Sequence, residues 1–295
     1  MSGPVVIGFD GSDSGEDALA LGGRLARATG ERAIVVAVYP EEAPIGPGRV
    51  DAEWVAHMRG HAQEAIAHAR RLAGEEGADY RVVGSGSAAH GLDDVAEAER
   101  ASVIVVGSTQ RGTLRRILPG STGQRLLHGA SCPVAIAPRG LRDREDGAFS
   151  AIGCAFLDTA DGREALRFAA DLAQRVGSRL RVYTVIAPRA EVFSPVIGRD
   201  AEEAFISNLR QAYRAALDRA LAGLPSELEA DGELLVGDVV DALSALDERD
   251  VDLLVLGSRG YGPLQRVLLG GVSSRVIRHA ASPVVVVPRS DEDGR

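Results

Sequence analysis

Short apolar runs alternate along the chain with longer segments in which apolar residues recur every three or four positions. The first runs are PVVIGF at 4–9 and AIVVAVY at 33–39, and between them Ala18, Leu21 and Leu25 have helical spacing. Such runs, bounded by glycine or proline, are typical of strands buried on both faces of a parallel sheet. The pattern predicts the order β-α-β-α-β-α-β-α-β, and therefore a parallel sheet with helices on both faces.

The pattern predicts this order twice in succession. Strands are predicted at 4–9, 33–39, 80–83, 152–156, 179–186, 234–236, 251–256 and 283–287, and helices from Ser14, at 51–72, at 92–99, around Ala165 to Val176, at 200–222 and at 272–279.

One stretch, residues 251–287, occurs a second time at 101–140 with an offset of 150. The tetrapeptide EDAL at 16–19 likewise matches REAL at 163–166, with an offset of 147. A period of this length is too long for a solenoid repeat and has the size of a domain. The sequence therefore predicts a tandem duplication.

The predicted domains are residues 1–140 and 150–289. Between them lies RGLRDREDGAFS at 139–150, which is charged and lacks apolar periodicity, and is therefore interpreted as a linker.

The repeated stretch combines a strand, a glycine turn and the start of a helix. In its second copy GSRGYG at 257–262 follows the strand, and the pair Gly270 and Gly271 precedes Ser273 and Ser274. Glycines allow backbone N–H groups to come close to a ligand, and the start of a helix favours an anion. This arrangement points to a nucleotide or a similar anion.

Composition and charge argue against several classes of protein, among them nucleic-acid-binding and membrane proteins. The chain has 295 residues, 45% of them hydrophobic, and a net charge of −9, which argues against general nucleic-acid binding. No apolar run reaches 18 residues and Met1 leads directly into a strand, so we expect no membrane partner. Cys132 and Cys154 provide no disulfide framework and are interpreted as core residues of a reducing compartment, which predicts a cytoplasmic protein.

The chain resembles the universal stress protein family over nearly its whole length, twice. The resemblance rests on the opening VVIGFDGS, the segment EDALALGGRLARATG, and a closing glycine turn, glycine pair and SPVVVVP. It implies the α/β fold of the adenine nucleotide alpha-hydrolases, with two doubly wound, open, parallel five-stranded sheets. It also implies a stress-response protein that binds adenine nucleotide, with ATP as the ligand and Mg²⁺ as its companion ion.

The resemblance also places the ligand between the first and fourth strands of each sheet. Asp10 corresponds to the acidic residue on the ribose and adenine side, and Val38 to the residue whose backbone contacts adenine. The residues implied around the phosphates in the first half are Gly107, Ser108, Gly120 and Ser121. The set in the second half that corresponds to the whole first-half site is Val185, Gly257, Gly260, Gly270, Ser273 and Ser274.

Neither half matches the family's glycine pattern completely. Gln110 replaces a glycine in the first half, Gly271 stands where a hydroxyl belongs in the second, and ungapped counting puts Leu157 where the first half has Asp10. Asp158 fits that place only with a shift of one residue. We expect unequal affinities, with phosphate held better by the second half, which keeps three glycines in spacing.

These departures leave three functions open. The chain is a nucleotide-responsive regulator or interaction protein, a slow ATPase or phosphotransferase, or a scaffold whose nucleotide sites have been lost. No GxxxxGK[ST] loop, carboxylate pair for a metal or base for an attacking water is evident, so no catalytic residue is assigned.

The candidate site residues also have structural explanations. Asp10 before Gly-Ser is typical of a turn or a helix cap, and the glycines suit tight packing. The arginines near the phosphate loops are of the kind found on solvated surfaces; they are Arg111, Arg115, Arg116, Arg259 and Arg266.

A row of histidines and glutamates on the helix at 51–72 suggests zinc as an alternative. Its members share one face, because they are spaced by three or four residues: Glu53, His57, His61, Glu64 and His68. We interpret them as an exposed polar stripe, since the row lies about 100° from the apolar face of that helix and the second half has no counterpart. No metal site is predicted.

Each half ends in an apolar strand, PVAIAP at 133–138 and PVVVVP at 283–288. The topology places both at a sheet edge, where unpaired N–H and C=O groups invite another strand. We therefore predict that residues 134–137 pair antiparallel with 284–287, so that the chain forms an intramolecular pseudo-dimer. A homodimer through other faces stays open, as does any protein partner.

Overall fold

A computed structural model describes residues 2–41, 52–73, 77–109, 117–144, 147–187, 199–247, 249–258 and 270–288, with side chains of the 199–247 segment from 206. The strands are β1 Val5–Gly8, β2 Ala33–Pro40, β3 Ala78–Ser85, β4 Val103–Gly107, β5 Val134–Ala137, β6 Ala151–Ala155, β7 Arg179–Ile186, β8 Ala230–Val236, β9 Leu253–Gly257 and β10 Val284–Val287. The helices are α1 Asp13–Thr29, α2 Ala52–Ala73, α3 Ala88–Glu99, α4 Ser121–Leu126, the short 3₁₀ helix η1 Leu141–Asp143, α5 Ala160–Val176, α6 Arg199–Ala222, α7 Val239–Ser244 and α8 Gly271–His279.

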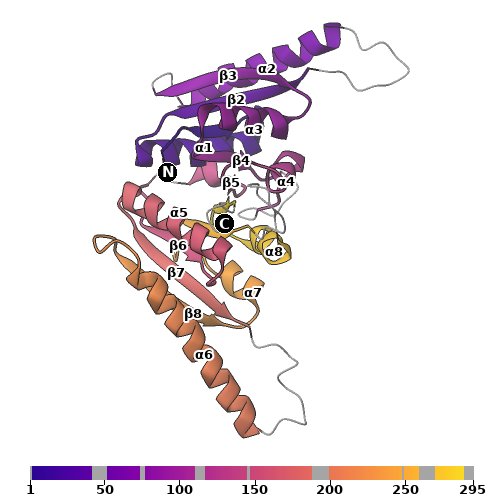
Figure 1. The fold of residues 1–295 in the computed structure, drawn as a ribbon. Helices are drawn as coiled ribbons and strands as arrows, with labels where there is room; N and C mark the ends of the chain where they lie inside the picture. Colours follow the sequence, from indigo (N-terminus) through magenta and orange to yellow (C-terminus); the bar gives the residue numbers. More distant parts are fainter. Residues whose placement is uncertain are drawn as a thin grey trace.

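The strands form one ten-stranded sheet in the order β3-β2-β1-β4-β5-β10-β9-β6-β7-β8. Within each half all pairs are parallel and the first strand lies between the second and the fourth, which confirms the predicted doubly wound α/β fold. The sheet twists along its length, and β3 and β8 are its two outer strands (Figure 1).

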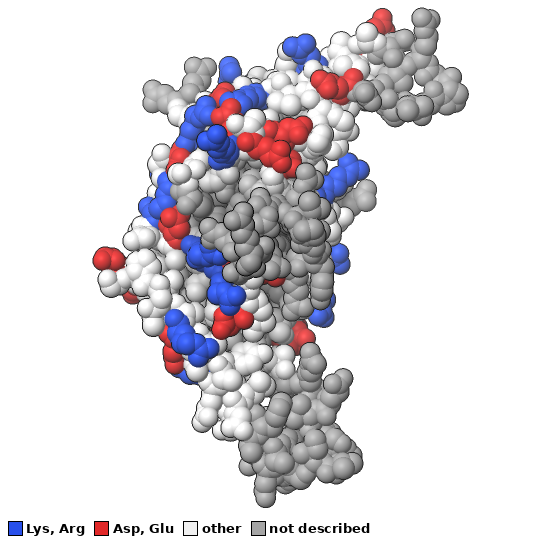
Figure 2. Space-filling model, in the orientation of Figure 1, with Lys and Arg blue, Asp and Glu red and all other residues white. Residues whose placement is uncertain are grey.

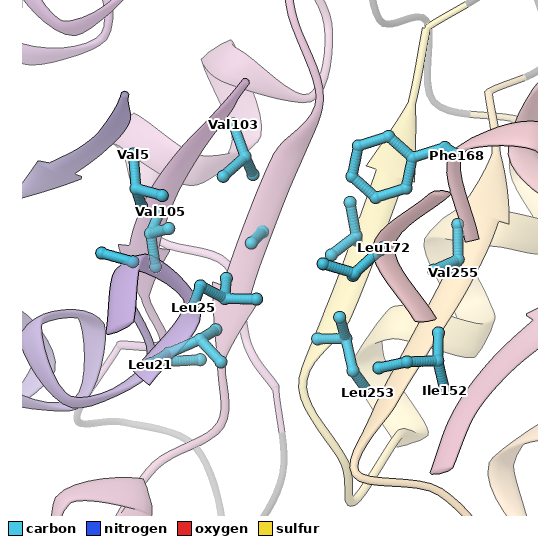
Figure 3. Packing of buried hydrophobic residues seen from close by; sticks show 14 of the residues in the cluster. Val5, Leu21, Leu25, Val103, Val105, Ile152, Phe168, Leu172, Leu253 and Val255 are labelled. Atoms are coloured by element: carbon cyan, nitrogen blue, oxygen red, sulfur yellow. The ribbon is translucent and has the colours of Figure 1, made fainter. Parts of the chain in front are cut away.

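Helices cover both faces of the sheet. Residues of α1, α2, α5 and α6 pack into one hydrophobic cluster, and residues of α3, α4, α7 and α8 into the other. Each cluster contains residues of both halves, so the cores of the two halves are continuous across the middle of the sheet. Figure 3 shows the cluster that contains α1 and α5, with Leu25 of α1 beside one of the two central strands and Phe168 and Leu172 of α5 beside the other.

The helix ends follow from local sequence. Ser12 and Thr159 accept hydrogen bonds from the amides of Gly15 and Gly162, and thereby cap α1 and α5 at the same place in each half. Both helices end at a glycine in the left-handed conformation, Gly30 with φ 70° and Gly177 with φ 68°.

The predicted pairing of the last strands is confirmed: β5 and β10 are antiparallel, with Val286 opposite Val134 and Val284 opposite Ile136. We call this pairing the seam. The Leu254 and Ser258 amides of β9 donate to the carbonyls of Pro283 and Val287, so the odd-numbered residues of β10 face β9. By the alternation of a strand, the amides of Val284 and Val286 face β5.

The seam is buried and apolar. Every residue of β5 and β10 is buried, and their side chains are almost completely inaccessible to solvent. The edge groups that made these strands candidates for pairing are therefore satisfied within one chain.

The linker is packed against the first half. The buried carboxylate of Asp17 in α1 accepts from the amides of Gly140 and Arg142, each at 2.9 Å. Leu141 and Phe149 are buried in the cluster that contains α1. The sequence of 139–150 does not predict these contacts, because each depends on a partner far away in the chain.

Two predicted strands need correction, and one helix was missed. The third strand of each half is longer than predicted, Ala78–Ser85 and Ala230–Val236, because both are outer strands that are only partly buried, so polar residues interrupt the apolar run. Helix α7, Val239–Ser244, was not predicted, since its six residues are too few to show a helical period. Cys154 is a core residue as expected, whereas Cys132 is only partly buried.

Candidate functional site

A cavity of about 360 Å³ lies at the carboxyl ends of β1, β2 and β4, where the strand order reverses. This is the place at which doubly wound sheets bind ligands. We call it cavity 1. The described residues that line it are Gly8, Phe9, Asp10, Ser12, Ser14, Gly15, Val36, Val38, Ala88, Leu92, Val106, Gly107, Thr109, Gly120, Ser121, Thr122 and Gly123.

Asp10 lies at the turn from β1 to α1. Its Oδ1 accepts from the Ser12 amide at 3.0 Å and from the Ser12 hydroxyl at 2.5 Å. Ser12 in turn caps α1 by accepting from the Gly15 amide at 3.3 Å. The side chain is exposed and lines cavity 1, so Asp10 shapes the turn and also offers a carboxylate to the cavity.

The glycines of cavity 1 have different structural reasons. A Cβ at Gly107 would lie 1.9 Å from the carbonyl oxygen of Ser14, so this glycine lets the start of α1 pack against the end of β4. A Cβ at Gly120 would meet only the Thr109 methyl group, at 3.0 Å. Substitution of Gly107 would therefore disturb the fold, whereas substitution of Gly120 acts mainly on the cavity wall.

The two ends of cavity 1 differ in polarity. Val36, Val38 and Leu92 form an apolar end beside β2 and α3. At the other end the hydroxyl residues Ser121 and Thr122 begin α4. The lining can therefore take a flat apolar group at one end and a polar or anionic group at the other.

The residues predicted for the first half mostly meet in cavity 1. Its lining includes Asp10, Val38, Gly107, Gly120 and Ser121.

Ser108 is placed differently. It is buried, and both its amide and its hydroxyl donate to the carbonyl of Ala137, at 3.0 and 2.8 Å, so it ties β4 to β5 and does not line the cavity. Gln110 and the predicted arginines Arg111, Arg115 and Arg116 lie outside the described residues.

A second cavity of about 550 Å³ occupies the same place in the second half, at the carboxyl ends of β6, β7 and β9. We call it cavity 2. The described residues that line it are Ala155, Phe156, Leu157, Thr159, Asp161, Gly162, Tyr183, Val185, Ala187, Tyr213, Val239, Leu243, Leu256, Gly257, Val272, Ser273 and Val276.

Of the residues predicted for the second half, Val185, Gly257 and Ser273 line cavity 2. The Ser273 hydroxyl donates to the Gly257 carbonyl at 3.3 Å. Gly270 and Ser274 are not among the lining residues; Gly270 caps α8, and the Ser274 amide donates to its carbonyl at 2.9 Å. Gly260, Arg259 and Arg266 lie outside the described residues.

The structure settles which residue of the second half corresponds to Asp10. Gly15 approaches Asp10 in the first half, and Gly162 approaches Leu157 in the second. Leu157 therefore takes the place of Asp10, as ungapped counting predicts. Asp158 does not line cavity 2; it pairs with Arg163 at 2.7 Å.

Several lining residues were not predicted. Examples are Ser14 and Thr109 in cavity 1 and Asp161, Tyr183 and Tyr213 in cavity 2. Aligning the halves with the offset of 147 would have paired Ser14 with Asp161 and Val36 with Tyr183, and so would have singled out both positions.

The histidine row of α2 has local contacts. The Nε2 atoms of His57 and His61 lie 2.9 Å apart, and His68 approaches Glu16 of α1 at 3.6 Å. Within the described ranges no group of three or more His, Cys, Asp or Glu side chains is placed to hold a metal ion. On the face shown in Figure 2, arginines lie interspersed with acidic residues.

Comparison with known proteins agrees with the fold. The sequence profile of the universal stress protein family matches residues 1–138 and 149–288. A universal stress protein of Mycobacterium tuberculosis is 32% identical over 291 residues, which cover 96% of this chain and 99% of that protein.

Solved structures extend the comparison. A universal stress protein from Archaeoglobus fulgidus superposes with a TM-score of 0.66 at 20% identity, over 99% of this chain and 98% of the other. A universal stress protein from Pseudomonas aeruginosa gives 0.62 at 16% identity, over 97% and 93%. At these sequence identities, the similarity to the two solved structures supports the fold alone. No helix in the described ranges is both long and apolar enough to span a bilayer. From the two profile matches and the relative that matches 96% of its length, the chain belongs to the universal stress protein family, in its tandem form.

Proposed function

We propose that cavity 1 binds an adenine nucleotide, ATP, and that the chain acts as a nucleotide-responsive regulator in a stress response. The observation that carries the proposal is the polarity of cavity 1, apolar at β2 and hydroxyl-lined at α4, with the Asp10 carboxylate at the end of β1. Its position at the reversal of strand order supports the same ligand class. Its volume of about 360 Å³ is within the range of small-molecule sites.

The lining residues fit the parts of ATP. Val36, Val38 and Leu92 would hold the adenine ring, and Asp10 would accept hydrogen bonds from the ribose hydroxyls. Thr109 has a buried hydroxyl with no hydrogen-bond partner in the described part of the chain, and it lies at the hydroxyl-lined end beside Gly120. The triphosphate would lie there, along the Gly120 backbone.

A Mg²⁺ ion would bind together with the nucleotide and not to the protein alone. Asp10 is the one acidic side chain among the described residues that line cavity 1, and it lies at the ribose end. The ion would therefore be held chiefly by phosphate oxygens and water.

The Asp10→Asn variant is expected to bind ATP about 5-fold more weakly than the wild type. Asparagine keeps the Oδ1 acceptor for Ser12, and so keeps the turn, but removes the charge that strengthens a hydrogen bond from ribose. Val38→Glu is expected to weaken binding by about a hundredfold, because a carboxylate would enter the apolar end.

Isothermal titration calorimetry of the full chain with MgATP measures both effects, and a thermal melt confirms that each variant is folded. Glu99→Gln serves as a surface control, since Glu99 pairs with Arg32 and Arg81 away from the cavity. The proposal fails if the wild type shows no heat of binding at millimolar ATP, or if Val38→Glu binds as well as the wild type.

A further inference from the structure

Cavity 2 has the backbone of cavity 1 but different side chains at the same positions. The strand register places Val36 beside Gly8 in the first half and Tyr183 beside Ala155 in the second. The close approaches of the glycines relate Asp10 to Leu157 and Ser14 to Asp161. Ala88 and Val239 are the first residues of α3 and α7, and Thr122 and Val272 are the second residues of α4 and α8. The exchanges from cavity 1 to cavity 2 are Asp10 to Leu157, Ser14 to Asp161, Val36 to Tyr183, Ala88 to Val239 and Thr122 to Val272.

The end of cavity 2 that corresponds to the ribose end of cavity 1 has no carboxylate in the place of Asp10. Leu157 is 43% exposed at the rim of cavity 2, an apolar side chain in the place of a carboxylate. The neighbouring Asp158 is held by Arg163 and lies 3.7 Å from Arg219. No carboxylate at that end faces cavity 2 from the described residues.

The end of cavity 2 that corresponds to the phosphate end of cavity 1 carries a carboxylate, Asp161, in the place of Ser14. A Cβ at Gly107 would lie 2.7 Å from the Ser14 hydroxyl, and a Cβ at Gly257 would lie 3.2 Å from the Asp161 Cβ. Asp161 therefore stands beside the glycine that ends β9, where the first half has a neutral hydroxyl. A carboxylate at this place repels a phosphate, and in a partly buried site water screens that repulsion only weakly.

The body of cavity 2 is aromatic and apolar. Tyr183 and Tyr213 contribute rings, and aliphatic side chains come from α7 and α8. Tyr183 is 1% exposed, and its buried hydroxyl has no hydrogen-bond partner in the described part of the chain. Because this hydroxyl is inaccessible to solvent, it is the ring of Tyr183 that cavity 2 offers to a ligand.

We propose that cavity 2 binds an uncharged aromatic small molecule, and that it discriminates against nucleotide anions. Its volume of about 550 Å³ is large enough for a ligand of two or three rings. The two halves of one sheet then serve two ligand classes. This inference does not depend on ATP binding in cavity 1.

Two fluorescent probes of nearly identical shape test the charge preference. N-phenyl-1-naphthylamine is neutral, and 8-anilino-1-naphthalenesulfonate has the same ring skeleton with one negative charge. The full chain is expected to bind the neutral probe at least about 10-fold more tightly. Asp161→Asn should remove most of that difference by strengthening sulfonate binding, with neutral-probe binding unchanged. Equal affinities in the wild type, or no effect of Asp161→Asn on the sulfonate, would overturn the proposal.

A matched pair of variants locates the probe. Val185 lines cavity 2 and Val38 lines cavity 1 at the position offset by 147. Val185→Glu is expected to weaken neutral-probe binding by at least about 10-fold, and Val38→Glu to leave it unchanged. Loss of the probe in Val38→Glu, or its retention in a folded Val185→Glu protein, would contradict the assignment. The Asp161→Asn comparison decides the matter if Val185→Glu does not fold.

Discussion

Val286→Pro is expected to lower the free energy of unfolding by about 3 kcal/mol and to uncouple the two halves of the protein. The Val286 amide faces β5, so proline removes a donor from the seam and leaves a buried acceptor on β5 without a partner. Both strands are almost fully buried, so water cannot replace the lost hydrogen bond. Val285 would be a less informative position, because its amide faces β9.

The measurement is thermal unfolding by circular dichroism and calorimetry. For a chain of this size the expected loss corresponds to a fall in Tm of roughly 6–12 °C, with the transition broadened or split. Val236→Pro is the matched control. Gly237 donates to Ile186, so by alternation the Val236 amide points away from β7 at the outer edge of the sheet, where proline is tolerated. If both variants lose the same stability, the seam is not what couples the halves.

Arg24→Ala is expected to cost about 2–3 kcal/mol, because Arg24 joins α1 to the linker and to the second half. It donates to the Gly147 and Ala148 carbonyls at 2.7 and 3.0 Å and to Asp252 at 2.9 Å, and its guanidinium lies 3.9 Å from the Phe149 ring. The side chains of the ion pair are only 16% and 18% exposed, so the variant leaves a largely buried carboxylate without its cation.

The effect of Arg24→Ala should depend on pH. Burial opposes ionisation of Asp252, but hydrogen bonds from the Ala151 amide, from Arg24 and from Ser150 outweigh it and lower its pKa. A carboxyl whose pKa is lower in the folded state contributes stability above its unfolded pKa of about 3.9, and loses that contribution as the pH falls through the folded value. The difference between wild type and variant should therefore be full at pH 7 and shrink below about pH 4.

Urea unfolding at several pH values measures this difference. Arg249→Ala is the control, since Arg249 pairs with Asp247 at 2.6 Å but its side chain is 88% exposed. Exposed pairs of this kind contribute at most about 1 kcal/mol. An Arg24→Ala protein as stable as the control would show that the linker contacts do not hold the halves together.

The fold was predictable because the internal repeat and the apolar strand segments can be recognised directly in the sequence. The offset of 150 between the two copies fixed the tandem architecture, and the apolar strands that end each half fixed the seam. The tertiary contacts that align the halves were not predictable. Arg24 and Asp252 are 228 residues apart, and Asp17 reaches the linker across more than 120 residues. Neither pair leaves a local pattern in the sequence.

The candidate site was predicted better for the first half than for the second. Asp10, Val38 and Gly120 meet in cavity 1, where the family resemblance placed them. For the second half the glycine spacing led us to expect the stronger phosphate site. The side chains that line the two cavities favour the opposite order in our proposal, because Asp161 stands beside Gly257 and Leu157 replaces the acid. Glycine spacing describes a backbone path and says nothing about the charges that face it.

The seam has a consequence for the protein during its synthesis. The two strands that close it lie about 150 residues apart, and at about 5–20 residues per second the ribosome needs roughly 8–30 s to make that length of chain. Throughout this interval β5 is an open edge whose four residues, Val134–Ala137, are all apolar. Neighbouring nascent chains on one messenger present the same edge at the same time, and such edges pair readily with each other. The order of strands thus gives this protein an interval in which cotranslational misassembly between chains competes with closure within the chain.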